Sequence, residues 1–123
     1  LLEPIRNRTA LATIMASCDA LVHGSSAETF GLVASEALAS GLPLVLPNAG
    51  AVADIAHPDF SETYVPGNAH DAASAIERLL DRDQHQLRSA AHHAAMTART
   101  LDEHFTELFQ TYADAISEKR EAA

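Results

Sequence analysis

The segment DALVHGSSAETFGLVASEALASGLPLVLP, residues 19–47, contains the pattern that decides the fold. It opens with a short apolar run that ends at Gly24, passes through a polar turn, and becomes rich in Ala and Leu up to Ser40. Gly41 is a typical stop at a helix C-terminus, and the apolar run after it closes at Pro47. Short apolar runs bounded by turn residues are typical of buried strands. The segment therefore predicts a strand, a helix and a second strand.

The rest of the chain continues this alternation. Residues 4–17 predict a helix, residues 48–56 a short helix behind a glycine turn, and residues 62–67 a third strand. Three further helical patterns cover residues 70–80, 84–98 and 101–116. Residues 117–123 read as a polar tail. This order is typical of an α/β fold, a Rossmann-like parallel sheet with helices on both faces.

Three short strands are too few for a complete doubly wound sheet, which has about five or six. We therefore expect residues 1–123 to be the later part of a larger domain, with the other strands upstream of Leu1. The last helical pattern carries an apolar stripe that needs a surface to pack on, either in this domain or in another. Its members recur at three- and four-residue steps: Leu101, Phe105, Leu108, Phe109, Tyr112 and Ile116.

Charge and composition exclude several classes of function. Eight basic against 17 acidic residues give a net charge of −9, which argues against a nucleic-acid partner. No apolar run approaches the roughly 20 residues that a membrane span needs. Cys18 is the only cysteine, so no internal disulfide can form, and a reducing cytoplasm is the expected compartment. Because it precedes an apolar strand pattern, we expect Cys18 to be a small buried residue rather than a nucleophile.

The polar turn before the first long helix is the best candidate for a binding site. Ligands of parallel sheets bind at the carboxyl ends of strands, and a helix N-terminus there offers free N–H groups to phosphate. Thr29 could cap this helix or donate its hydroxyl, and Gly31 would let a ligand approach the backbone. Glu36 lies about 7.5 Å further along the helix and is suited to a neutral diol such as ribose. Glu28, in the turn, would face another hydroxyl-rich group.

A plainer interpretation of the same residues also fits. Glu36 can be the solvent-facing position of an Ala-rich helix, and Glu28 can simply complement the helix dipole. A glycosidase acid/base pair is a weaker alternative, because Glu36 is set back along the helix.

Beyond these arguments, the stretch ETFGLVASEALASGLPLV resembles the glutamate–seven–glutamate motif of retaining, family 4 (group 1) glycosyltransferases with the GT-B fold. The flanking stretches CDALVHGS, PNAGAVADI and AASAIERLLDRD are similar to the segments around that motif. The resemblance covers nearly the whole chain and implies the C-terminal, nucleotide-sugar-binding domain. The chain departs from the family at His23-Gly24, where Pro-Ser is frequent, and in the glycine-free stretch HPDFSET.

The resemblance implies roles for particular residues. Glu28 matches the glutamate that contacts the donor sugar near the reacting centre, and Glu36 matches the one that binds the ribose hydroxyls. Residues 29–32 match the turn whose backbone amides hold sugar and diphosphate oxygens. His23 ends the first strand beside the groove, where it could contact donor or acceptor. The expected site has Glu28 as catalytic residue and, as donor-binding residues, His23, Gly24, Thr29, Phe30, Gly31, Leu32 and Glu36.

The implied activity is a hexosyltransferase that moves a sugar, with retention, from a UDP- or GDP-linked donor to a glycan or lipid-linked acceptor. The donor is a substrate, and neither cofactor nor metal is implied. The basic pair that neutralises the diphosphate and the acceptor-binding N-terminal domain would lie upstream, so we expect the chain alone to be inactive. The expected location is the cytoplasm, and peripheral docking on the inner face of the membrane is left open. A nucleotide-binding or interaction module without catalysis, or an epimerase of the same fold, are the alternatives.

The chain also contains an Asp-x-Asp stretch and a group of histidines in its C-terminal half. Asp81-Arg82-Asp83 spells a D-x-D metal motif, but it lies between two helical patterns and is better interpreted as a polar break. Adjacent His92 and His93 would face about 100° apart on a helix, which is poor geometry for joint metal ligation. His85 and His92 share a face that we expect to be solvated.

Overall fold

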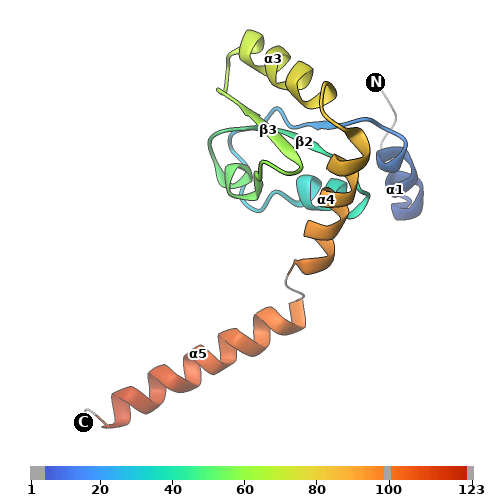
Figure 1. Cartoon of the computed structure of the whole chain (residues 1–123). Coiled ribbons are helices and arrows are strands. Elements are labelled where there is room, and N and C mark those ends of the chain that lie inside the picture. The colour runs from blue at the N-terminus through green and yellow to red at the C-terminus, as the bar shows by residue number, and fades with distance from the viewer. Residues whose placement is uncertain (1–4, 99–100, 122–123) are drawn as a thin grey trace.

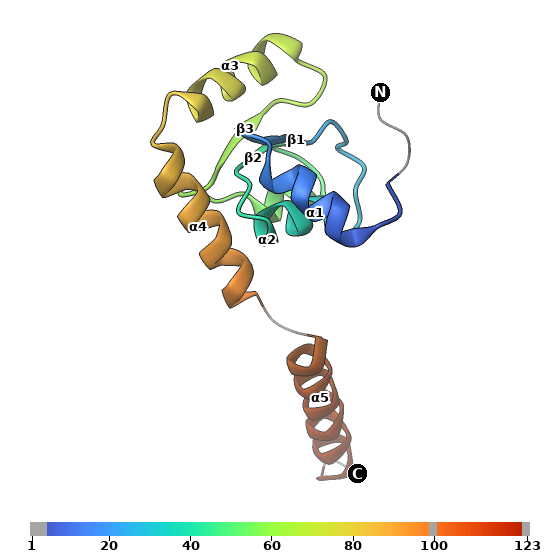
Figure 2. The same cartoon turned by 90° about the vertical axis from the view of Figure 1, so that its right-hand side faces the viewer.

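The computed structural model describes residues 5–98 and 101–121 as a three-stranded parallel sheet surrounded by helices. The strands are β1 (Leu21–Val22), β2 (Leu44–Pro47) and β3 (Ser61–Tyr64), in that order across the sheet. Leu21 pairs with Leu44, and Leu44 pairs with Ser61. Figures 1 and 2 show the sheet enclosed by helices, with α5 extending away from the rest of the domain. The predicted α/β class and parallel sheet are confirmed.

The helices fall close to their predicted positions. They are α1 (Arg8–Ala16), α2 (Leu32–Ala39), α3 (Ala69–Leu80), α4 (Gln84–Thr97) and α5 (Leu101–Glu121), with the 3₁₀ helix η1 at Ala51–Ile55. Within the described residues, side chains cap three of them at the N-terminus: Asn7 for α1, Asn68 for α3 and Asp83 for α4.

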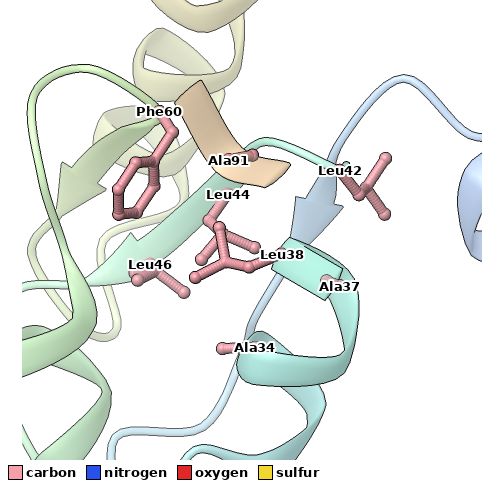
Figure 3. Packing of buried hydrophobic residues seen from close by; sticks show 8 residues of the cluster. All are labelled: Ala34, Ala37, Leu38, Leu42, Leu44, Leu46, Phe60 and Ala91. Atoms are coloured by element: carbon pink, nitrogen blue, oxygen red, sulfur yellow. The ribbon is translucent and has the colours of Figure 1, made fainter. Parts of the chain in front are cut away.

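Alternation along β2 explains why both faces of the sheet are covered. Leu44 and Leu46 pack against Ala34, Ala37 and Leu38 of α2, with Phe60 and Ala91 closing the cluster. Figure 3 shows Leu38 directed toward the β2 leucines. Val45 points to the opposite face, where its neighbours are Tyr64, Ala75, Leu79 and Leu87. Because the middle strand is buried throughout, its sequence reads as a continuous apolar run.

Several predicted boundaries were wrong. Residues 5–7 are not helical, so α1 begins at Arg8 behind the Asn7 cap; Pro4 lies outside the described residues. The third strand ends at Tyr64, before a turn that passes through Gly67, and α5 continues to Glu121 through the predicted polar tail. The last two residues of that tail, 122–123, lie outside the described residues.

Cys18 is exposed rather than buried, and its thiol donates to the Ile14 carbonyl oxygen at 3.2 Å. The residue lies in the turn between α1 and β1, where the chain has not yet entered the core. Among the described helices, none combines the length and apolar character that crossing a membrane would require.

Candidate functional site

Two loops meet at the carboxyl ends of the strands. The loop after β1 spans residues 23–31, and the loop after β2 spans residues 48–50. Gly50 joins them: a Cβ built on it would lie 2.3 Å from the Ser26 carbonyl oxygen, and its φ of 77° falls in the left-handed region. Only glycine permits this approach of one backbone to another. The predicted site therefore rests on the glycine turn that follows β2.

Glu28 has a protein neighbour at each carboxylate oxygen. Its Oε1 accepts the Thr29 backbone N–H at 3.2 Å, and its Oε2 lies 3.6 Å from Nε2 of His23. The side chain is 29% exposed, so it is oriented by these neighbours while still open to a ligand. A carboxylate in this setting can accept hydrogen bonds from hydroxyl groups.

His23 is 9% exposed, and both its side chain and its main chain make hydrogen bonds. Its Nδ1 accepts the Ser25 N–H at 3.3 Å, and its carbonyl oxygen accepts the Tyr64 hydroxyl at 2.6 Å. Sequence reasoning placed His23 beside the groove but missed Tyr64. A tyrosine within the predicted third strand was the available signal, since a buried phenol needs a partner for its hydroxyl.

The N-terminus of α2 differs from the expectation in two ways. Thr29 does not cap the helix: Gly31 occupies the N-cap position, and no side chain bonds the first-turn amides. Gly31 is also buried rather than open to a ligand, with φ of 64° and Ile55 Cδ1 2.4 Å from a built Cβ. The first turn contains no acidic residue, so its N–H groups remain suited to an anion.

Phe30 and Leu32 flank Gly31 with their side chains in solvent, 77% and 66% exposed. Gly24 is exposed as well, and a built Cβ there would meet no atom within 4 Å. The Thr29 N–H is already given to Glu28, so the amides of this turn are not all open to a ligand.

Glu36 is exposed and borders a cavity of about 270 Å³ between α1 and α2. Leu11, Ala12 and Met15 form its apolar wall, and Arg8 is its basic lining residue. Sequence reasoning did not single out Arg8, which could be recognised only once α1 was placed beside α2. A carboxylate next to an apolar wall can bind a hydroxyl-rich group whose neighbour is flat and apolar.

A larger cavity of about 500 Å³ lies elsewhere, between the loop before β3 and α4. It is at the amino end of β3, whereas Glu28 lies in the loop at the carboxyl end of β1. Asp83, one of its lining residues, caps α4 by accepting the N–H groups of His85 and Gln86 at 2.9 and 3.0 Å. Asp81 is the C-cap of α3, so the D-x-D stretch is the polar break between two helices.

Metal-ligand clusters do not form in the part of the chain that the structure describes. His85, His92 and His93 are all exposed on α4, which agrees with the expected solvated face.

Most of the chain is similar to known glycosyltransferases. The family model described as glycosyl transferases group 1 matches residues 4–96. The chain is 34% identical over 117 residues to the GDP-mannose-dependent alpha-mannosyltransferase of Corynebacterium glutamicum, covering 87% of the chain and 26% of that protein. It is 34% identical over 121 residues to the D-inositol 3-phosphate glycosyltransferase of Mycolicibacterium smegmatis, covering 95% and 27%. The chain thus spans about a quarter of the length of the curated relatives it matches.

The fold of the chain is also similar to that of solved glycosyltransferase structures. Sucrose-phosphate synthase from Thermosynechococcus elongatus is 25% identical, with a TM-score of 0.72 over 89% of this chain and 28% of that one. Anabaena HepE, solved in complex with UDP, is 26% identical, with a TM-score of 0.62 over 85% and 29%. These similarities agree with the predicted GT-B type. Since the family model covers most of the sequence, the chain belongs to the glycosyl transferases group 1 family.

Proposed function

We propose that the protein containing this chain transfers a sugar from a nucleoside diphosphate donor to an acceptor hydroxyl, with retention of the anomeric configuration. In this proposal residues 1–123 form the later part of the donor-binding domain, and the acceptor-binding domain lies outside them. The chain alone would bind the donor weakly and would not catalyse transfer.

The observation that carries the proposal is the order of groups along the loop after β1 and along α2. Glu28 stands on one side of the α2 N-terminus, and Glu36 stands one and a half turns along α2 at its own cavity. An uncapped helix start without acidic residues suits the diphosphate between them. The two carboxylates would repel phosphate, so each is suited to a neutral hydroxyl-bearing group instead.

Each part of the donor then has a partner. Glu36 accepts hydrogen bonds from the ribose hydroxyls, while the apolar wall of Leu11, Ala12 and Met15 lies where the face of a base can pack. Glu28 accepts hydrogen bonds from the hydroxyls of the transferred sugar. The first-turn amides of α2 stabilise the charge that develops on the leaving diphosphate. None of these steps requires a metal or a cofactor.

The relatives support a nucleotide sugar as the donor class. One is named for dependence on GDP-mannose, and a structural neighbour was solved with UDP. Both UDP and GDP therefore belong in the binding test. The acceptor would be a glycan or a lipid-linked hydroxyl compound, bound largely outside this chain.

The test is calorimetric titration of the intact protein with UDP and GDP. We expect Glu36→Ala to weaken nucleotide binding about 10- to 100-fold, the usual effect of losing hydrogen bonds to a charged group. Glu28→Ala is expected to leave nucleotide affinity within about twofold and to abolish sugar transfer, because it contacts the sugar and not the nucleotide. Glu77→Ala, on the exposed face of α3, is the matched control and should change neither quantity. If Glu36→Ala and Glu28→Ala both behave like that control, the proposal is wrong.

A further inference from the structure

We infer that His23 is a positioning residue for Glu28 rather than a donor-binding residue, and that Tyr64 holds His23 in place. The inference deepens the proposed function and rests on it, because it assumes that Glu28 meets the donor sugar. Three residues take part, from three places: the end of β1, the end of β3 and the turn before α2.

The first step is the anchoring of the His23 main chain. Its backbone N–H donates to the Val45 carbonyl oxygen at 2.9 Å, which continues the pairing of β1 with β2 beyond Val22. Its own carbonyl oxygen accepts the Tyr64 hydroxyl at 2.6 Å, across the sheet from β3. Tyr64 is buried, 7% exposed, so this bond is shielded from water. Both backbone groups of His23 are thus fixed by other strands.

The second step is the orientation of the imidazole. Nδ1 accepts the Ser25 N–H at 3.3 Å, and a ring nitrogen that accepts a hydrogen bond carries no proton. In the neutral form the ring therefore has its proton on Nε2. Nε2 is the nitrogen that lies 3.6 Å from Glu28 Oε2. The proton is therefore on the nitrogen nearest the carboxylate, at a distance that can tighten when a ligand binds.

The third step concerns what remains for a ligand. His23 is 9% exposed, its Nδ1 accepts the Ser25 N–H and its Nε2 faces Glu28 at 3.6 Å, so it has little polar surface to offer a donor. Glu28 keeps 29% exposure and has further lone pairs on its two held oxygens. The carboxylate is therefore the group that touches the sugar, and the histidine acts through it.

Kinetics on the intact protein test this chain of contacts. We expect His23→Ala to lower kcat about 10- to 100-fold, as expected when a catalytic group is misplaced by about 1 Å. Nucleotide affinity should stay within about twofold, because the nucleotide lies on the Glu36 side. His23→Gln places an amide N–H near the position of Nε2 and should recover most of kcat. His92→Ala, an exposed histidine on α4, is the matched control and should leave kcat unchanged.

Tyr64→Phe keeps the buried ring and removes only the hydroxyl, so it should lower kcat in the same direction and by less than His23→Ala. Combining His23→Ala with Glu28→Gln should reduce kcat no further than Glu28→Gln alone, since both changes act through one carboxylate. Losses that multiply, or a raised nucleotide Kd with unchanged kcat, would mean that His23 contacts the donor directly and would overturn the inference.

Nitrogen NMR of the histidine rings in the intact protein gives a readout that needs no turnover. We expect the neutral His23 ring to carry its proton on Nε2, and the Nε2 signal to move in Glu28→Gln. A proton on Nδ1, or an Nε2 signal indifferent to Glu28, overturns the positioning role even if transfer is observed. Conversely, a protein with the expected NMR signals whose transfer and nucleotide binding ignore Glu28 and Glu36 contradicts the proposed function instead.

Discussion

At the scale of single residues, Gly50 is the most constrained position near the site. Its backbone has φ of 77° and ψ of 179°, a region that essentially only glycine occupies, and the Ser26 carbonyl oxygen occupies the space of a Cβ. We expect Gly50→Ala to lower the free energy of unfolding of the chain by about 1–3 kcal/mol from strain alone. It should also push away the loop that carries Glu28. Urea unfolding measures the first effect, and amide chemical shifts of residues 24–28 measure the second.

Gly67 provides the matched control for this prediction. It also has a positive φ, 79°, but a Cβ there would meet no atom within 4 Å. Gly67→Ala should therefore show the cost of backbone strain without any shift in residues 24–28. Equal losses of stability and equal chemical-shift changes in the two variants would show that the contact with Ser26 has no effect.

Some features of the candidate site could be predicted from the sequence and others could not. The motif spacing placed Glu36 on the second turn of α2, and the structure has it exposed beside a cavity. Thr29 does not cap α2 and Gly31 is buried, because the chain turns through a left-handed Gly31 that packs on Ile55. Ile55 lies 24 positions away, and local patterns carry no information about such a neighbour. The contact of His23 with Tyr64 was missed for the same reason.

At the scale of elements, the break between α3 and α4 depends on Asp83. Its carboxylate accepts the N–H groups of His85 and Gln86, so Asp83→Ala leaves those donors without this cap. We expect a loss of about 1 kcal/mol in the free energy of unfolding. Asp81→Ala is the matched control: Asp81 contributes its backbone N–H to the end of α3, and removing a negative charge there is neutral or slightly favourable.

The same pair of variants tests the alternative interpretation of Asp81-Arg82-Asp83 as a metal motif. Mn²⁺ or Mg²⁺ should leave the unfolding midpoint unchanged in the parent chain and in both variants. A metal-dependent rise that disappears in Asp81→Ala and Asp83→Ala alike would contradict the capping role.

The order of helices and strands was predictable because apolar runs and glycine stops are visible in the local sequence. The exact ends of the helices depend on which side chain caps the free backbone N–H groups of the first turn. Within the predicted run 42–47, residues 44–47 form the buried central strand β2, as its continuous apolar character indicates. The start of α1 was misplaced because Asn7, not the preceding proline, supplies the cap. The end of α5 was misplaced because a charged sequence such as SEKRE is compatible with a solvent-exposed helix as well as with a tail.

At the scale of the whole molecule, the apolar stripe of α5 is the most prominent exposed apolar surface on the described residues. Phe105, Phe109, Tyr112 and Ile116 are exposed on one face of a helix that extends away from the sheet (Figures 1 and 2), and the rings of Phe105 and Phe109 stack at 6.2 Å. The side chain of Leu101, also predicted in the stripe, lies outside the described residues. A row of this kind marks a surface that attracts apolar partners.

We therefore expect the isolated 123-residue chain to bind a hydrophobic dye such as ANS through α5, and the double change Phe109→Gln, Tyr112→Gln to lower that fluorescence strongly. Because both side chains are exposed, the free energy of unfolding should change by less than about 0.5 kcal/mol per substitution. Thr111→Gln, which lies off the stripe, is the control and should leave dye binding unchanged. A double variant that loses both stability and dye binding would contradict this prediction. It would mean that the stripe packs within this chain and that ANS does not bind to an exposed face of α5.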